Sequence, residues 1–227
     1  MTSTTRSPQT DARSQAWLRG LLAVAWADGN FDENERQLIA ELTHGESQTA
    51  ELEPISPQEL AEAFDNDPHV SENFLRTAVM VAIADGVYTT TEDKVLQDFC
   101  EALGVRPEAL DTLRHTLETL EDNGESASLA VGDAGDVSKG GKIDVLAPVR
   151  GWLDNVEMHD PKVARFLCRM IPSQCPFERD ITLFGKKVVH IPAMCKLNPL
   201  YEQLVGLRFR ALSYLADDCD EDVTPYL

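Results

Sequence analysis

A short motif occurs twice in the first half of the chain, and this repeat constrains the fold more than any other feature. The run Val-Ala-x-Ala-Asp-Gly begins at Val24 and again at Val81, and a glutamate follows each aspartate at the same distance. The two copies lie 57 residues apart. A period of this length usually marks a duplicated supersecondary unit. The sequence therefore predicts that the first half consists of two related units.

Each copy has the pattern of a helix, a glycine-centred turn and a second helix. The first helix of each copy is apolar nearly all round, as expected for a helix at the centre of a domain. Gly29 and Gly86 stand where a left-handed cap would end that helix. A capping side chain followed three residues later by glutamate predicts three helix starts, at Asp32–Glu35, Ser56–Glu59 and Thr89–Glu92. We expect an all-α bundle over residues 14–120.

Charge is spread unevenly along the chain. The sequence holds 39 acidic and 20 basic side chains, a net charge of −19, and residues 1–140 alone hold 27 acidic and 9 basic ones. Between the halves, residues 121–142 are rich in Gly, Ser and Asp, which predicts a flexible linker. The chain thus divides into a helical bundle at 14–120, a linker at 121–142 and a C-terminal domain at 143–227.

The composition also excludes several classes of protein. Nucleic-acid binding requires Lys and Arg to neutralise phosphates, and the acidic excess argues against it. No run approaches the roughly 18 apolar residues of a membrane span, and Met1–Thr10 lacks the apolar core of a signal peptide. The chain has five cysteines, an odd number without a secreted disulfide spacing, so we expect a reducing cytoplasm.

Helix signals in the second half predict a small, α-rich domain. A short helix is expected over residues 144–156, bent or started at Pro148. Asp160-Pro161 has the pattern of an N-cap followed by proline, and it predicts a helix that ends at Pro172. Asn198-Pro199 predicts the start of a long final helix. The expected fold class is therefore mainly α, with an N-terminal bundle of two repeated halves and a linker before this domain.

One β-hairpin is expected within this second domain. Residues 181–191 alternate in polarity on each side of Gly185-Lys186, which favours a two-residue turn with glycine first. If Phe184 faces Lys187 across the turn, the same register places Ile181 opposite His190 and Leu183 opposite Val188.

The repeated Ala-Asp-Gly…Glu element resembles the motif of the tellurite-resistance TerB family, over roughly residues 14–120. This resemblance implies a compact helical bundle, an association with stress and metal-related operons, and metal binding through acidic residues. Here those residues would be Asp28, Glu35, Asp85 and Glu92, whose oxygens suit a divalent ion. The alternative is structural: both glutamates close capping boxes, and both aspartates bond their own turns.

Three strings in the second half, Cys175–Ile181, His190–Tyr201 and Leu207–Leu212, closely resemble the family called the Mo-dependent nitrogenase C-terminal domain. The match covers roughly residues 144–224, and the family is found chiefly in cyanobacteria. This resemblance implies no established catalytic role. The chain is far too short for a nitrogenase catalytic subunit, so nitrogenase chemistry and its molybdenum cofactor are not expected.

Cys168, Cys175, His190 and Cys195 form a second candidate metal site. Three thiolates and an imidazole could hold zinc or an iron–sulfur cluster. Against this, the chain has no CxxC motif, and the ligand spacing fits no standard site. The alternative is that Cys168 is a buried helix residue and that His190 lies in the core of the domain. Both interpretations remain open from the sequence.

Basic side chains make the second domain locally positive, and they are candidate partner-binding residues: Arg179, Lys186, Lys187, Lys196, Arg208 and Arg210. They could bind an acidic protein surface, an anionic lipid face or the acidic first domain of the same chain. A solvated charged surface is the alternative.

No nucleophile motif, phosphate-binding loop or zinc-protease motif occurs in the sequence. We therefore expect a non-catalytic cytoplasmic adaptor that binds a protein partner, in stress response or complex assembly, and that can touch a thylakoid surface without spanning it. The alternative is a metal-binding protein, with zinc, an iron–sulfur cluster or a divalent ion at the Cys175/Cys195 hairpin base or at the Asp/Glu repeat.

Overall fold

The computed structural model describes residues 8–27, 54–84, 88–114, 146–171, 179–183, 186–191 and 200–227. The predicted linker and the turns at Gly29 and Gly86 lie outside these residues. None of the described helices is both long and apolar enough to span a membrane.

The first part of the chain is helical throughout its described residues. Its helices are α1 (Pro8–Ala25), α3 (Pro57–Ala63), α4 (Pro68–Ala82) and α5 (Thr90–Leu103), followed by a helical segment at residues 108–114. Ser56 and Thr89 close the predicted capping boxes with Glu59 and Glu92. These reciprocal bonds satisfy backbone groups that a helix start would otherwise leave unpaired. Local sequence therefore determines where α3 and α5 begin.

The second part contains α7 (Ala147–Leu153), α8 (Pro161–Met170) and α10 (Tyr201–Ser213). A π-helical turn, η1 (Tyr214–Asp218), and a 3-10 turn, η2 (Thr224–Tyr226), follow α10. Asp160 caps α8 as predicted, because its side chain accepts hydrogen bonds from the backbone of Lys162 and Val163. By contrast, α10 begins later than predicted, with Leu200 rather than Asn198 at its N-cap.

Two antiparallel strands, β1 (Arg179–Leu183) and β2 (Lys186–Ile191), form a hairpin whose register differs from the predicted one. Ile181 pairs with Val189 rather than His190, and Leu183 pairs with Lys186 rather than Val188. The register shifts between Ile181 and Thr182. Such an irregularity places an extra residue on one strand, which a constant pairing rule cannot foresee.

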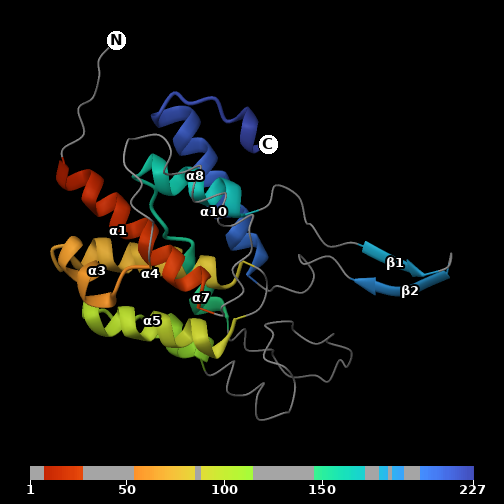
Figure 1. The fold of residues 1–227 in the computed structure, drawn as a ribbon, viewed down its shortest axis with the longest axis horizontal. Coiled ribbons are helices and arrows are strands. Elements are labelled where there is room, and N and C mark those ends of the chain that lie inside the picture. Colours follow the sequence, from red (N-terminus) through yellow and green to blue (C-terminus); the bar gives the residue numbers. More distant parts are fainter. Residues whose placement is uncertain are drawn as a thin grey trace.

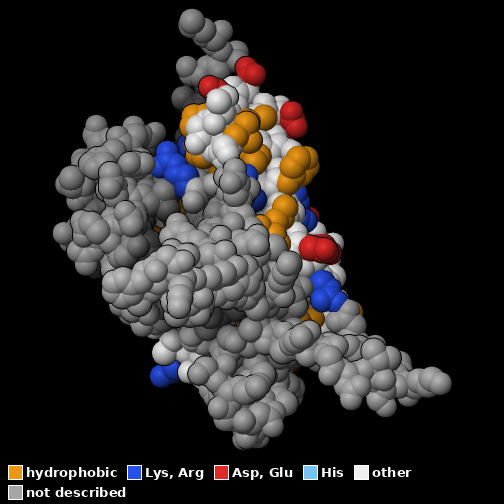
Figure 2. All heavy atoms as spheres, turned by 90° about the vertical axis from the view of Figure 1, so that its right-hand side faces the viewer, with side chains coloured by type: hydrophobic (Ala, Val, Ile, Leu, Met, Phe, Trp, Pro, Cys, Tyr) orange, Lys and Arg blue, Asp and Glu red, His pale blue; other side chains and the backbone are white. Residues whose placement is uncertain are grey.

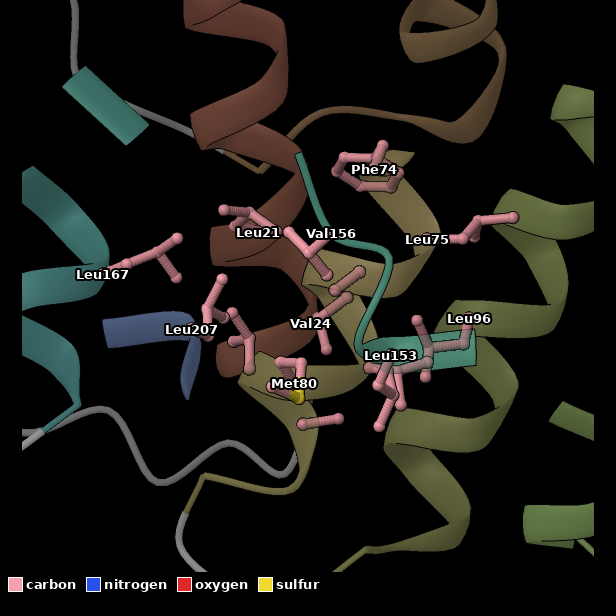
Figure 3. Close-up of a cluster of buried hydrophobic side chains, with 14 of the residues drawn as sticks. Leu21, Val24, Phe74, Leu75, Met80, Leu96, Leu153, Val156, Leu167 and Leu207 are labelled. Carbon is pink, nitrogen blue, oxygen red and sulfur yellow. The ribbon is translucent and has the colours of Figure 1, made fainter. Parts of the chain in front are cut away.

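The helices of both parts bury their apolar faces in one continuous core. Figure 1 shows α8 of the second part beside α1 of the first, with which it is in direct contact, and α10 packs against α8. Figure 3 shows side chains from both parts meeting in this core, among them Leu21, Val24, Met80, Leu153, Val156, Leu167 and Leu207. The two parts therefore share buried surface.

Some large apolar side chains lie outside this core. Val205 and Phe209, four residues apart on α10, are 46% and 68% exposed. Figure 2 shows apolar side chains gathered between charged ones on the face at the right-hand side of Figure 1.

An aromatic cluster fixes the approach of α1 to α4. Phe74 of α4 lies 5.6 Å from Trp17, 5.5 Å from Phe64 and 5.4 Å from Phe99, measured between ring centroids, with edge-to-face geometry in each pair. Gly20 lies against this ring: a Cβ added there would be 2.7 Å from Phe74 Cζ. Because Phe74 is fully buried, its ring cannot move aside. Glycine at position 20 is what allows the two helices to approach.

Replacing Gly20 by alanine should lower the free energy of unfolding by up to about 2 kcal/mol, since overpacking costs about 1–3 kcal/mol and the higher helix propensity of alanine offsets about 1 kcal/mol of that cost. The matched control is Gly151→Ala in α7, where an added Cβ would meet no atom within 4 Å. The control should gain about 0.5–1 kcal/mol. Urea unfolding measures both, and equal changes would contradict the packing argument.

Candidate functional site: a pocket where the two parts meet

Asn73 joins the two parts through a pair of hydrogen bonds to the main chain of Glu157. Asn73 Nδ2 donates to the Glu157 carbonyl at 2.9 Å, and the Glu157 N–H donates to Asn73 Oδ1 at 2.9 Å. A carboxamide offers one donor and one acceptor side by side, which matches the two backbone groups. Asn73 is only 4% exposed, and both hydrogen bonds are partly buried. These bonds hold the segment before α8 against α4.

Further polar contacts cross the same junction. Trp152 Nε1 of α7 donates to Glu72 Oε1 of α4 at 3.0 Å, and the Arg76 guanidinium lies 5.6 Å from the Trp152 ring centroid. Arg76 also bonds Glu72 at 2.7 Å. At the other end, Ser14 Oγ of α1 donates to Asp160 Oδ2. Hydrogen bonds therefore connect α1 and α4 to three points of the second part.

A pocket of about 250 Å³ opens beside these contacts. Its walls come from α1, from residues 69–77 of α4, and from residues 157–163, which lead into α8 and form its first turn. The apolar part of the wall consists of Trp17, Val70, Met158 and Val163, and the polar part of Arg13, Ser14, His69, Asn73, Thr77, Glu157, His159 and Asp160. The pocket exists only because the two parts pack against each other.

Trp17 presents carbon rather than nitrogen to this pocket. Its ring packs 5.4 Å from Phe64 and 5.6 Å from Phe74, between centroids, which fixes its orientation. Its Nε1 is buried without a hydrogen-bond partner, so the accessible part of the side chain is the carbon surface of the indole. That surface suits an apolar group, and the face of an aromatic ring also attracts cations.

Glu157 lies at the mouth of the pocket between two histidines. Its carboxylate is 2.9 Å from His159 Nε2 and 3.7 Å from His69 Nε2. The hydrogen bond with His159 is the main cause that lowers the pKa of Glu157. The carboxylate is therefore ionised at neutral pH. All three side chains are substantially exposed, so a molecule entering the pocket would meet them first.

Two further carboxylates lie near the mouth. Asp160 is held by its capping bonds to α8 and by Ser14. Asp65 bonds Arg13 at 3.2 Å, which balances the guanidinium that lines the pocket. Arg13 is therefore the permanent cation among the lining residues and is paired with Asp65, while the carboxylates of Glu157 and Asp160 also line the pocket. The arrangement can hold an apolar group inside and a positive charge outside.

Of the four predicted acidic metal ligands, the structure describes only Glu92. Its carboxylate accepts from the Thr89 N–H at 2.8 Å and from Thr89 Oγ1 at 2.7 Å, and its own N–H bonds Thr89 Oγ1. This is the structural role that the sequence left open as an alternative. Asp28, Glu35 and Asp85 lie outside the described residues.

Of the predicted sulfur site, only the Cys168 side chain is described. It is 3% exposed within α8, and burial raises its pKa to about 11. His190 is placed in β2 by its backbone alone, and Cys175 and Cys195 lie outside the described residues. Within the described ranges, no three His, Cys, Asp or Glu side chains are arranged to hold a metal ion.

Two of the predicted partner-binding residues make contacts within the chain. Arg208 Nε donates to the Ile171 carbonyl at 2.9 Å and its Nη2 to the Tyr226 carbonyl, while Arg210 donates to the Asp154 carbonyl. Arg179, Lys186 and Lys187 lie in the hairpin strands, which the structure describes by their backbone. Lys196 lies outside the described residues.

Sequence reasoning did not find the residues of this pocket. The Asp160 cap was visible in the sequence. Nothing in the sequence, however, pairs Asn73 with Glu157, because a contact across more than 80 residues leaves no local pattern.

The fold and the site define a mainly helical protein of two parts with a pocket at their junction. A family model described as "Protein of unknown function (DUF533)" matches residues 1–117, and one described as "Mo-dependent nitrogenase C-terminus" matches residues 145–227. The chain belongs to the DUF533 family, whose model covers more than half of it and which is TerB-like. Both predicted resemblances are confirmed. No curated protein and no solved structure matches the chain.

Replacing Asn73 by alanine should lower the free energy of unfolding by about 1–3 kcal/mol, because two part-buried hydrogen bonds worth about 0.5–1.5 kcal/mol each are lost. Asn155→Ala is the matched control, since Asn155 makes one exposed hydrogen bond, to Gly151. The control should cost about 1 kcal/mol or less. Urea unfolding followed by circular dichroism compares them. A cost at Asn73 no larger than at Asn155 would show that the pair does not stabilise the junction.

The Cys168 thiol should react with iodoacetamide at pH 8 about a hundredfold or more slowly in the folded protein than in urea. A thiol with a pKa of about 11 is almost entirely protonated at this pH, whereas an unfolded cysteine has a pKa near 8.5. Peptide mass spectrometry after timed alkylation measures the rate at each cysteine. The internal control is Cys219, which is half-buried and should react faster. Rapid labelling of Cys168 would refute its buried role.

Proposed function

We propose that this protein is a non-catalytic cytoplasmic binding protein, an adaptor that receives an apolar group of a partner protein in the junction pocket. The observation that carries the proposal is the pocket itself, whose apolar wall combines Trp17 and Val70 of the first part with Met158 and Val163 of the second. Concave sites with apolar walls and a few polar groups are the usual form of binding sites. The family matches support the non-catalytic assignment, because no catalytic family is evident in them.

The hairpin supports a second contact for such an adaptor. Strands β1 and β2 contain three basic residues, Arg179, Lys186 and Lys187, against one acidic residue, Asp180. An acidic partner surface would complement them, and such complementarity accelerates association more than it raises affinity. The basic strands and the pocket would then act on different parts of one complex.

Photo-crosslinking from the pocket tests the proposal. A photoreactive phenylalanine analogue in place of Met158 should yield a crosslinked product of defined mass in cells that encode the chain. Val70→Trp should abolish that product, because the larger side chain fills the pocket from its apolar wall. Val95→Trp is the matched control: Val95 is a half-buried valine of α5 outside the pocket wall. Circular dichroism confirms that both variants fold.

A product that persists in Val70→Trp, or no product at all, would contradict binding in the pocket. The metal-binding alternative has a separate signature, which elemental analysis of the same protein reveals. Stoichiometric zinc or iron that is lost in Cys175→Ser and Cys195→Ser variants would favour that alternative over the adaptor.

A further inference from the structure

The charged residues at the pocket mouth favour the entry of some chemical groups over others. Two carboxylates, from Glu157 and Asp160, line the pocket, and Arg13 is the permanent cation among the lining residues. Asp65 pairs with that cation at 3.2 Å. An anionic ligand would therefore meet repulsion, whereas a cationic one would be attracted.

Glu157 is the carboxylate placed to receive such a charge. Its backbone is held by Asn73, so the residue cannot move away, yet its side chain remains 47% exposed. Its side-chain partners among the described residues are His69 and His159, which are 68% and 72% exposed. Exposed imidazoles can turn aside at low cost, because no buried contact holds them. A cation could then take the place of an imidazole at this carboxylate.

The pocket interior suits the rest of a cationic ligand. The accessible surface of Trp17 is aromatic carbon, which attracts ammonium and guanidinium groups through its π electrons as well as apolar stems. Val70, Met158 and Val163 complete an apolar wall. The net charge of −19 would also steer cations toward the protein over longer distances.

We propose that the junction pocket binds an organic cation, an ammonium or guanidinium group carried on an apolar body, with Glu157 as its counter-ion and Trp17 as its aromatic wall. The inference rests on the proposed function and specifies its ligand. The same chemistry is found in a free amine and in a Lys or Arg side chain of a partner protein.

Three probes that share one aromatic body separate charge from shape: 2-phenylethylamine, 2-phenylethanol and 3-phenylpropionate. Isothermal titration at low salt should show the amine binding about tenfold more tightly than the alcohol, and the carboxylate most weakly. Glu157→Gln should weaken amine binding about five- to tenfold and leave alcohol binding unchanged. This variant keeps the Asn73 bonds, which use only the Glu157 backbone. The matched control is Glu108→Gln, an exposed acid outside the pocket wall, which should change amine binding less than twofold.

Capped peptides identify the source of the cation. Acetyl-Leu-Arg-Leu-amide binding more tightly than both 2-phenylethylamine and acetyl-Leu-Gln-Leu-amide would assign the site to a partner's side chain. Tighter binding of the free amine would assign it to a small molecule.

An amine that binds no better than the alcohol would overturn the cation inference while leaving an apolar binding pocket in place. Amine preference that survives Glu157→Gln would overturn the assigned counter-ion. If no probe binds, the inference is wrong altogether, and the crosslinks from position 158 then decide separately whether the pocket faces a partner.

Discussion

The paired hydrogen bonds between the Asn73 side chain and the Glu157 main chain are the contact on which the rest of the arrangement depends. Asn73 belongs to α4, at the centre of the first part, and Glu157 precedes the N-cap of α8 in the second. Because both backbone groups of Glu157 are bound, the direction in which the chain enters α8 is determined. The Asn73 side chain therefore positions His159 and Asp160. These two residues form part of one wall of the pocket.

The shared core explains why a polar contact can have such an effect. Residues of α1, α4, α7, α8 and α10 bury their apolar faces together, so the two family segments do not simply lie on opposite ends of a linker. Ligands commonly bind at the interface between two segments. Such a cavity is enclosed only when both segments are in place. Here each segment contributes both apolar and polar residues to the pocket. Neither segment alone would form it.

Local chemistry made part of this structure predictable. The caps at Ser56, Thr89 and Asp160 involve residues within three positions of each other, so sequence spacing alone identified them. The same local bonds account for Glu92, which the TerB resemblance offered as a metal ligand. Prediction was wrong in the hairpin register, because the pairing shifts after Ile181 and simple arithmetic assumes a constant register.

The sequence by itself determined the helical class, the helix starts at Ser56, Thr89 and Asp160, and the two family resemblances, because each rests on residues that are neighbours along the chain. Only the tertiary structure decided that Asn73 meets Glu157, that Gly20 must admit the Phe74 ring, and that aromatic carbon and carboxylates share one pocket. These contacts join residues far apart in the chain, and their partners are chosen by the packing of whole helices. The spacing of residues along the sequence cannot predict these contacts, because they stabilise the protein only after the helices have packed together.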